Sequence, residues 1–536
     1  MKRPFYASLG LLPLVLLGAC GTTSSEDASE AIQDGGAAGN PDSDGSLGEA
    51  GAVIAEAGVD GSPDASAGYF RSVDQSESQQ LPFTLGDTTY TYRSALMHDV
   101  TGDGVPDVLV TIGTYPKNIS HPLMIIDGKA PLANIAPSVF APGGITSVRH
   151  SNQIFLADFD NDGLEDLLVS EAGLDHPPWT GDKIGIAINK GGGKYADISN
   201  TVPARAQGLR SYSLAAGRFF NDGVTRLVVP SQTQPDQSVL LSWQASAFVV
   251  QENWVDNALW WTPDNFSQTS FMEARDFDGD GYVDLYGSGS WTTPNHRILW
   301  GGKNFPAAAD LTQLPEGKTG HTTWANYDKP GVQTAQGGDV NRVVFDDFNG
   351  DGKLDIVSFT EQVNVFKPGA FTDTSYPDYQ TIKDSGGVAY YTGWLQVLEG
   401  DGSRTFTDIT SRSGSGDLGM KYYVALFSKD LDLDGDLDLV GHYWSKYYNN
   451  QLSGPRWGTT VFLNDGNAGF RALDAANLFP ELKAQSPDPA ALGIGAMFPI
   501  SITADSVEGI FLLPVDTNVP VPFLRVKRFK ALGRFH

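Results

Sequence analysis

The sequence predicts an all-β fold, a seven-bladed β-propeller of four-stranded antiparallel blades. The first observation is composition, because the 536 residues include 61 glycines and 31 prolines, which is typical of a turn-rich β protein. The second is a short acidic pattern that recurs along the chain, starting at residues 99, 158, 218, 276, 347, 430 and 505. The third is that each copy lies between apolar runs of strand length. A long repeat of strands and turns predicts a propeller.

The second repeat shows how each unit is expected to fold. An apolar strand at 151–157 leads into the acidic turn, and a second apolar strand follows at 167–169. After a variable loop come a third strand at 184–189, a glycine-rich turn at 191–193 and a fourth short strand at 195–198. Glycine, asparagine and aspartate supply the positive φ angles that such tight turns need. Seven units of four strands close into a ring that leaves only short sheet edges.

The acidic turns predict metal sites. Alternate side chains of a tight turn point inward, and all of them here carry oxygen, the donor that calcium prefers. Histidine and cysteine are missing from these ligand sets, so zinc and copper are not expected. We expect Ca²⁺ at five turns, with a backbone carbonyl at the seventh position of each. The expected ligands are Asp99, Thr101, Asp103, Val105 and Asp107; Asp158, Asp160, Asp162, Leu164 and Asp166; Asp276, Asp278, Asp280, Tyr282 and Asp284; Asp347, Asn349, Asp351, Lys353 and Asp355; and Asp430, Asp432, Asp434, Asp436 and Asp438.

These five turns resemble the D-x-[DNT]-x-[DN]-G-x-x-D loop of FG-GAP/VCBS repeats, which form the integrin α-subunit propeller and its bacterial relatives. The resemblance covers roughly residues 85–515. It implies a seven-bladed propeller with calcium on one face and ligand binding on the other. The turns do not match an EF-hand, because the twelfth-position glutamate is missing and the flanks are strand-like.

The two weaker repeats are expected to bind no metal. In the third unit, Arg218 and Arg226 stand where the first and last ligands belong, and Phe220 replaces the middle one. A guanidinium cannot bind calcium, but it can take a cationic position beside Asp222. The seventh copy, near Asp505, is shortened and also lacks the ligands.

The N-terminus predicts an exported lipoprotein. Lys2 and Arg3 precede a short apolar stretch, and residues 17–20 (Leu-Gly-Ala-Cys) resemble a bacterial lipobox. Residues 1–19 are therefore interpreted as a signal peptide, and Cys20, the only cysteine, as the lipidated residue that anchors the chain to a membrane, with the outer membrane or cell surface as the expected location. Residues 20–68 are rich in Gly, Ala, Ser and acidic residues, which predicts a disordered linker. The propeller is expected at 69–536.

The variable loops between the second and third strands suggest a ligand surface on the face opposite the calcium loops. Aromatic side chains recur there, and they combine a large contact area with a polar tip. A glycan or protein ligand is the expected partner, although rings that only pack these loops onto the blades would give the same pattern. The candidate ligand-binding residues are Tyr115, Trp179, Trp291, Trp444, Tyr447 and Tyr448.

These features favour a monomeric binding or adhesion module over an enzyme. The sequence contains no G-x-S-x-G, H-E-x-x-H or P-loop motif. A polysaccharide lyase or hydrolase and a purely structural envelope protein remain the alternatives. Glu171 and Asp175 are the carboxylates a glycan-cleaving site would need, and they are interpreted as solvated loop residues. The formal net charge of −28 argues against a nucleic acid partner.

Overall fold

The computed structural model describes most of residues 70–536. The longest stretches left out between them are 252–268, 316–331, 367–388, 446–455 and 479–495. The chain divides into two units, 1–63 and 64–536, and the described residues all belong to the second. The signal peptide, Cys20 and the linker expected from the sequence therefore lie outside them. Among the described residues, no helix has the length and apolar character needed to cross a membrane.

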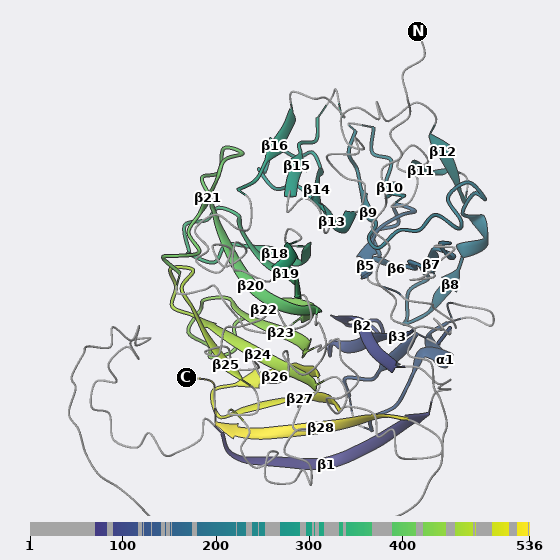
Figure 1. Cartoon of the computed structure of the whole chain (residues 1–536). Coiled ribbons are helices and arrows are strands. Elements are labelled where there is room, and N and C mark those ends of the chain that lie inside the picture. Colours follow the sequence, from purple (N-terminus) through teal and green to yellow (C-terminus); the bar gives the residue numbers. More distant parts are fainter. Residues whose placement is uncertain are drawn as a thin grey trace, which may run out of the picture. The chain divides into compact units, whose positions relative to one another are not determined.

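The second unit is a seven-bladed β-propeller, as the sequence predicts (Figure 1). Its blades are seven antiparallel sheets, numbered here in chain order. Blade one contains β2 (Thr89–His98), β3 (Asp107–Tyr115) and β4 (Met124–Ile126), followed by α1 (Ala136–Val139). Blade two contains β5 (Gln153–Ala157), β6 (Asp166–Ser170), β7 (Gly185–Asn189) and β8 (Tyr195–Asp197), followed by the 3₁₀ turn η1 (Ser199–Thr201). Blade three contains β9 (Ala215–Gly217), β10 (Arg226–Val229), β11 (Val239–Gln244) and β12 (Ala247–Gln251).

Blades four to seven complete the ring. Blade four contains β13 (Thr269–Arg275), β14 (Asp284–Gly289), β15 (His296–Leu299) and β16 (Leu311–Gln313). Blade five contains β17 (Val332–Ala335), β18 (Asp339–Asp346), β19 (Asp355–Phe366), β20 (Ala389–Gly400) and β21 (Phe406–Asp408). Blade six contains β22 (Tyr422–Lys429), β23 (Asp438–Ser445), β24 (Arg456–Asn464) and β25 (Phe470–Asp474). Blade seven contains β26 (Ala496–Thr503), β27 (Ser506–Leu513), β28 (Phe523–Gly533) and β1 (Phe70–Pro82).

Apolar packing between neighbouring blades holds the ring together. The described residues form seven apolar clusters, and each combines side chains from successive blades. One cluster joins Val108 of blade one to Phe498 and Val526 of blade seven, which closes the circle. The second strands are buried on both faces, as in β6, and this explains why they read as continuous apolar runs instead of alternating ones.

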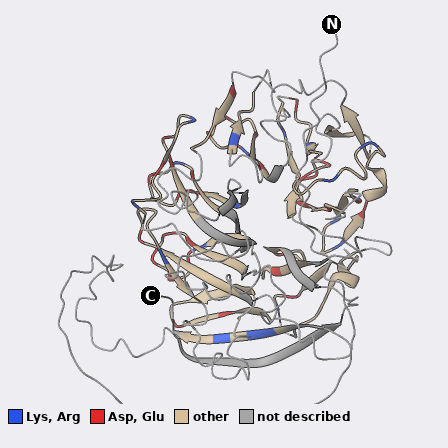
Figure 2. Ribbon diagram, in the orientation of Figure 1, with Lys and Arg blue, Asp and Glu red and all other residues tan. Residues whose placement is uncertain are grey.

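The N-terminal strand closes the ring, which the sequence analysis did not foresee. β1 pairs antiparallel with β28 and forms the outer strand of blade seven. The register places Asp74 opposite Lys530 and Glu77 opposite Arg528. Figure 2 shows the basic residues of β28 as a blue segment on this otherwise acidic chain. The first and last segments of the propeller therefore complete one sheet.

Two further blades depart from four consecutive strands. Blade one has three strands in the part of the chain that the structure describes, extended by an isolated bridge between Ile126 and Asn134. In blade five, β17 and β18 both pair with the long strand β19, at its far and near ends respectively. The blade is therefore five-stranded.

Candidate metal centres

The acidic turns connect the first and second strands of blades one, two, four and six, and β18 to β19 in blade five. All five share one hydrogen-bond pattern. In each, the first aspartate accepts a hydrogen bond from the backbone N–H of the glycine at the sixth position. This bond draws the turn into a loop around the carboxylates. The bonds are Gly104 N to Asp99 Oδ2 (2.7 Å), Gly163 N to Asp158 Oδ2 (3.2 Å), Gly281 N to Asp276 Oδ2 (2.9 Å), Gly352 N to Asp347 Oδ2 (2.8 Å) and Gly435 N to Asp430 Oδ2 (3.2 Å).

One oxygen of the fifth-position aspartate accepts a hydrogen bond within the loop. Its Oδ1 accepts the N–H of the seventh residue, so its other oxygen is left for a partner outside this bond. The bonds are Val105 N to Asp103 (2.9 Å), Leu164 N to Asp162 (2.9 Å), Tyr282 N to Asp280 (2.9 Å), Lys353 N to Asp351 (2.9 Å) and Asp436 N to Asp434 (3.0 Å). The sixth-position glycine adopts a positive φ in every loop, for example +86° at Gly163, which only glycine reaches easily.

The last aspartate of each loop is fully buried and has a second role that the sequence did not reveal. In blade six, Asp438 is 0% exposed, and its two oxygens accept N–H groups from Leu431 and Asn464, each at 2.8 Å. Leu431 belongs to the loop and Asn464 ends the third strand, so the carboxylate joins two segments of the blade. Asp166, Asp284 and Asp355 accept equivalent pairs from Phe159 and Asn189, Phe277 and Gly301, and Phe348 and Gly400, and Asp107 accepts N–H groups from Thr101 and Gly128.

Three of these loops bring carboxylates close enough to share a metal ion. One oxygen from each member lies within 4.8 Å of the others in the groups Asp158, Asp160 and Asp166; Asp276, Asp278 and Asp284; and Asp430, Asp432 and Asp438. The other two loops have Thr101 and Asn349 at the third position, so their third ligand would be a neutral oxygen. The side-chain oxygen of Asn349 faces the loop, because it accepts the N–H of Asp351 at 3.0 Å.

Two buried carboxylate oxygens in these groups have no hydrogen-bond donor. They are Oδ1 of Asp160 and Oδ1 of Asp430. A buried oxygen of a charged group that lacks a partner is costly, and a cation in the loop would satisfy it. Burial and the neighbouring charge of Asp434 also raise the pKa of Asp432. The donor set, the spacing and the unsatisfied oxygens therefore fit a hard divalent cation.

The third unit replaces the metal position with a buried guanidinium. Both terminal nitrogens of Arg226 contact the carboxylate of Asp222, and Nη1 also donates to the carbonyl of Val224 at 2.9 Å. These are the fifth-position side chain and seventh-position carbonyl of this turn, the atoms that would face a metal. The guanidinium lies over the ring of Phe220, 4.3 Å from its centroid. The predicted cation beside Asp222 is thus Arg226, whereas Arg218 contacts Asp158 of blade two at 3.5 Å.

Replacing Arg226 by alanine is expected to lower the free energy of unfolding by about 2 kcal/mol, because the change removes the guanidinium that both Asp222 and the Val224 carbonyl bind. The loss is smaller than for a fully buried pair since Asp222 is 45% exposed. Urea denaturation measures the change. Arg412→Ala is the control, because Arg412 forms an exposed ion pair with Glu399 and its loss should cost less than about 1 kcal/mol. Equal losses of unfolding free energy in the two variants would contradict a stabilising role for Arg226.

The buried aspartates predict an unusual pH dependence. Burial raises the pKa of Asp107, Asp166 and Asp355 to about 6, and that of Asp284 and Asp438 to about 7. In the metal-free protein, the folded state then binds more protons than the unfolded chain between their ordinary and raised pKa values. Stability therefore falls as the pH rises through 6 to 7, and it is regained on acidification.

We expect the melting temperature in chelator to be higher at pH 5.5 than at pH 7.5. Saturating calcium should raise the melting temperature more at pH 7.5 than at pH 5.5, because the ion replaces the protons on the buried aspartates. Differential scanning fluorimetry at both pH values, with and without calcium, measures this. Metal-free protein that melts at a lower temperature at pH 5.5 than at pH 7.5 would contradict the prediction.

Tyr115 and Trp444 are the candidate ligand-binding residues whose strands the structure describes. Tyr115 ends β3 and Trp444 lies in β23, opposite Tyr422 and Trp457, but their side chains are outside the described part of the chain. Trp179, Trp291, Tyr447, Tyr448 and the candidate acid Asp175 also lie outside it. Glu171 was expected to be solvated, and this is wrong. It is 6% exposed because it directly follows β6, every residue of which is buried.

The structure also shows cations beside the loops that sequence reasoning missed. Lys129 contacts Asp103 at 2.8 Å, Lys190 contacts Asp160 at 3.7 Å, and Lys353 contacts Asp351 at 2.9 Å. Arg404 of blade five contacts Asp278 and Asp280 of blade four. Lys353 could have been found from its place inside the loop. The partners of the others depend on how blades and turns are arranged in space.

Comparisons with known proteins do not assign a family. No family model matches the chain, and no curated protein sequence matches it. Among solved structures, a GH62 hydrolase in complex with xylotriose is 10% identical, covers 59% of this chain and 90% of its own, and has a TM-score of 0.23. The β-fructofuranosidase from Schwanniomyces occidentalis complexed with fructosyl-erythritol is 8% identical, covers 85% and 98%, and has a TM-score of 0.29. Scores this low support no statement about activity.

Proposed function

We propose that this chain is a calcium-binding propeller of the FG-GAP/VCBS type, with one Ca²⁺ in each of the five acidic loops. The observation that carries the proposal is the pair of buried, unpartnered oxygens, Asp160 Oδ1 and Asp430 Oδ1, inside groups of converging carboxylates. Arg226 supports it independently, because the turn that lacks the first, third and ninth ligands places a guanidinium against the remaining ligand oxygens, those of Asp222 and the Val224 carbonyl. In this proposal the turn contains a bound cation in five blades and a guanidinium in blade three.

The residues that would hold the ion are those at the first, third, fifth and ninth positions, together with the carbonyl at the seventh. Calcium would neutralise their negative charge, and their free oxygens would coordinate the ion. The ninth-position aspartates give the ion its structural effect, because the same carboxylates bind the ends of the third strands. Binding in the loop therefore stabilises the whole blade.

We further propose that the protein works outside the cell as an anchored binding module. The lipobox at Cys20 and the acidic linker support export and display. Weak calcium sites of extracellular modules fill at about 10⁻⁴–10⁻³ M, a concentration found outside cells rather than in the cytosol. A glycan or protein ligand on the face opposite the calcium loops is the function that fits these features best.

The test is ligand capture with calcium as the variable. The chain without its first 19 residues is applied to a glycan array and used to capture surface proteins, in millimolar calcium and in chelator. The proposal expects a ligand that is bound in calcium and released by chelation. Alanine variants of Trp179, Trp291 and Trp444 should lose it without a change in melting temperature. Turnover of a polysaccharide, or no ligand in either condition, would contradict a binding module.

A further inference from the structure

The turn between the third and fourth strands of one blade reaches the acidic loop of the blade before it. Three such turns share a backbone hydrogen bond between their first and fifth residues, which aligns Gly193, Arg404 and Ala468 at the fourth position. All three adopt a positive φ, of +69°, +69° and +58°. A Cβ at Gly193 would lie 2.9 Å from the Thr101 carbonyl of blade one, and Ala468 donates its N–H to Phe348 of blade five.

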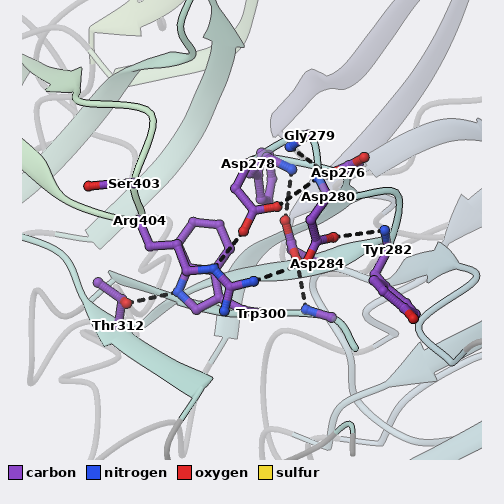
Figure 3. Close-up of polar contacts among 12 residues, drawn as sticks. Asp276, Asp278, Gly279, Asp280, Tyr282, Asp284, Trp300, Thr312, Ser403 and Arg404 are labelled. Atoms are coloured by element: carbon purple, nitrogen blue, oxygen red, sulfur yellow. Dashed lines mark hydrogen bonds and ion pairs between the residues drawn. The ribbon is translucent and has the colours of Figure 1, made fainter. Parts of the chain in front are cut away.

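Only one of these three positions carries a long side chain, and that side chain is cationic. Gly193 and Ala468 carry no side-chain nitrogen, whereas Arg404 extends from blade five into the loop of blade four (Figure 3). A positive φ is uncommon for arginine, so the turn places this residue in a conformation that glycine would adopt at lower cost.

The guanidinium of Arg404 binds two of the expected metal ligands. Nε contacts Asp278 Oδ2 at 2.5 Å, and Nη2 contacts Asp280 Oδ2 at 3.1 Å. The guanidinium carbon lies over the indole of Trp300, 4.9 Å from the ring centroid, and Trp300 is itself buried and donates a hydrogen bond to Thr312. Stacking and two charge-assisted hydrogen bonds fix the cation at the loop.

Arg404 contacts both the third- and the fifth-position aspartates of its loop, whereas Lys129 and Lys353 contact the fifth-position aspartates of blades one and five. The Oδ1 atoms of Asp278 and Asp280 already accept the N–H groups of Asp280 and Tyr282, and Arg404 takes both Oδ2 atoms. In blade two, by contrast, the third-position Asp160 keeps a buried oxygen without a donor. The loop of blade four therefore already has part of its negative charge balanced from within the protein.

We propose that Arg404 is an intramolecular competitor for the metal site of blade four. A divalent cation binds this loop only when the guanidinium leaves Asp278 and Asp280, so the site is weaker than its counterpart in blade six, for which the described residues show no ion pair. Occupancy of blade four is thereby linked to the position of a turn in blade five. This inference rests on the proposed calcium function.

The experiment measures calcium binding to the full chain by isothermal titration calorimetry, for the unchanged protein and for Arg404→Gln and Arg404→Lys. Removing the positive charge should tighten calcium binding at the loop of blade four on the order of tenfold, given the strength of charge interactions at this distance near a protein surface. Arg404→Lys, which keeps the charge, should tighten it much less. In an Asp276→Asn background the effect of Arg404→Gln should disappear, whereas in the matched Asp430→Asn background of blade six it should persist.

Trp300 gives a second signal that does not depend on affinity. Calcium should change its emission in the unchanged protein, because the stacked guanidinium leaves, and should not do so in Arg404→Gln; Trp300→Phe identifies the signal. If calcium binds but Arg404→Gln alters neither the isotherm nor the emission, the inference is wrong and the calcium proposal stands. If no variant binds calcium at all, the proposed function itself is wrong.

Discussion

Asp438→Ala is expected to lower the free energy of unfolding in calcium by about 3–5 kcal/mol, the range for removing one partner of a buried charged network. The substitution removes a proposed metal ligand, and it also leaves the buried N–H groups of Leu431 and Asn464 without an acceptor. Urea denaturation in millimolar calcium measures the loss. Part of it should remain in chelator, because the two backbone bonds do not depend on the ion.

Asp436→Ala is the matched control from the same loop. Asp436 is expected to contribute only its carbonyl, and its neighbours Asp434, Asp430 and Asp465 repel its charge. Alanine keeps the carbonyl and removes that repulsion, so stability should change by less than about 0.5 kcal/mol. A loss at Asp436 as large as that at Asp438 would show that the loop does not depend on the buried aspartate.

Removal of β1 is expected to have the largest effect of all. Deleting residues 1–82 takes away the outer strand of blade seven and leaves the long strand β28 as an open edge. An open edge of this length promotes aggregation, and the ring loses the strand that joins its two ends. We expect the shortened protein to be insoluble or to melt at least about 10 °C lower.

Deletion of residues 1–68 is the control, because it removes the predicted linker and keeps β1. Its melting temperature should equal that of the chain that starts at Cys20. Thermal melting and size-exclusion chromatography compare the two deletions. A soluble protein without β1 that melts at the same temperature as the control would refute the closure of the ring by β1.

The overall fold could be predicted because its signals are local. Each loop combines inward-facing aspartates with glycine, and the second strand that follows is a continuous apolar run, as in residues 167–169. The closure by β1 could not be predicted, because it pairs segments from opposite ends of the propeller. The sequence of β1 is also polar and lacks the apolar run that marks the other strands.

The acidic residues of the candidate sites were also visible in the sequence, but their environment was not. The chemical type and spacing of the aspartates do not show that Asp438 is buried against the end of the third strand. The contact of Arg404 with Asp278 joins residues in two blades, and only the stacking of the ring creates it. Comparison of aligned turns could have singled out Arg404, because a cation there replaces glycine or alanine.

Calcium content and calcium-dependent stability, measured on one sample, test the central claim most directly. The purified chain is analysed for bound metal after gel filtration in calcium, and its melting temperature is then compared in chelator and in millimolar calcium. The loops described here predict about five Ca²⁺ ions per chain and a melting temperature at least about 10 °C higher with calcium at neutral pH. A metal-free protein with the same melting temperature in both solutions would contradict the account.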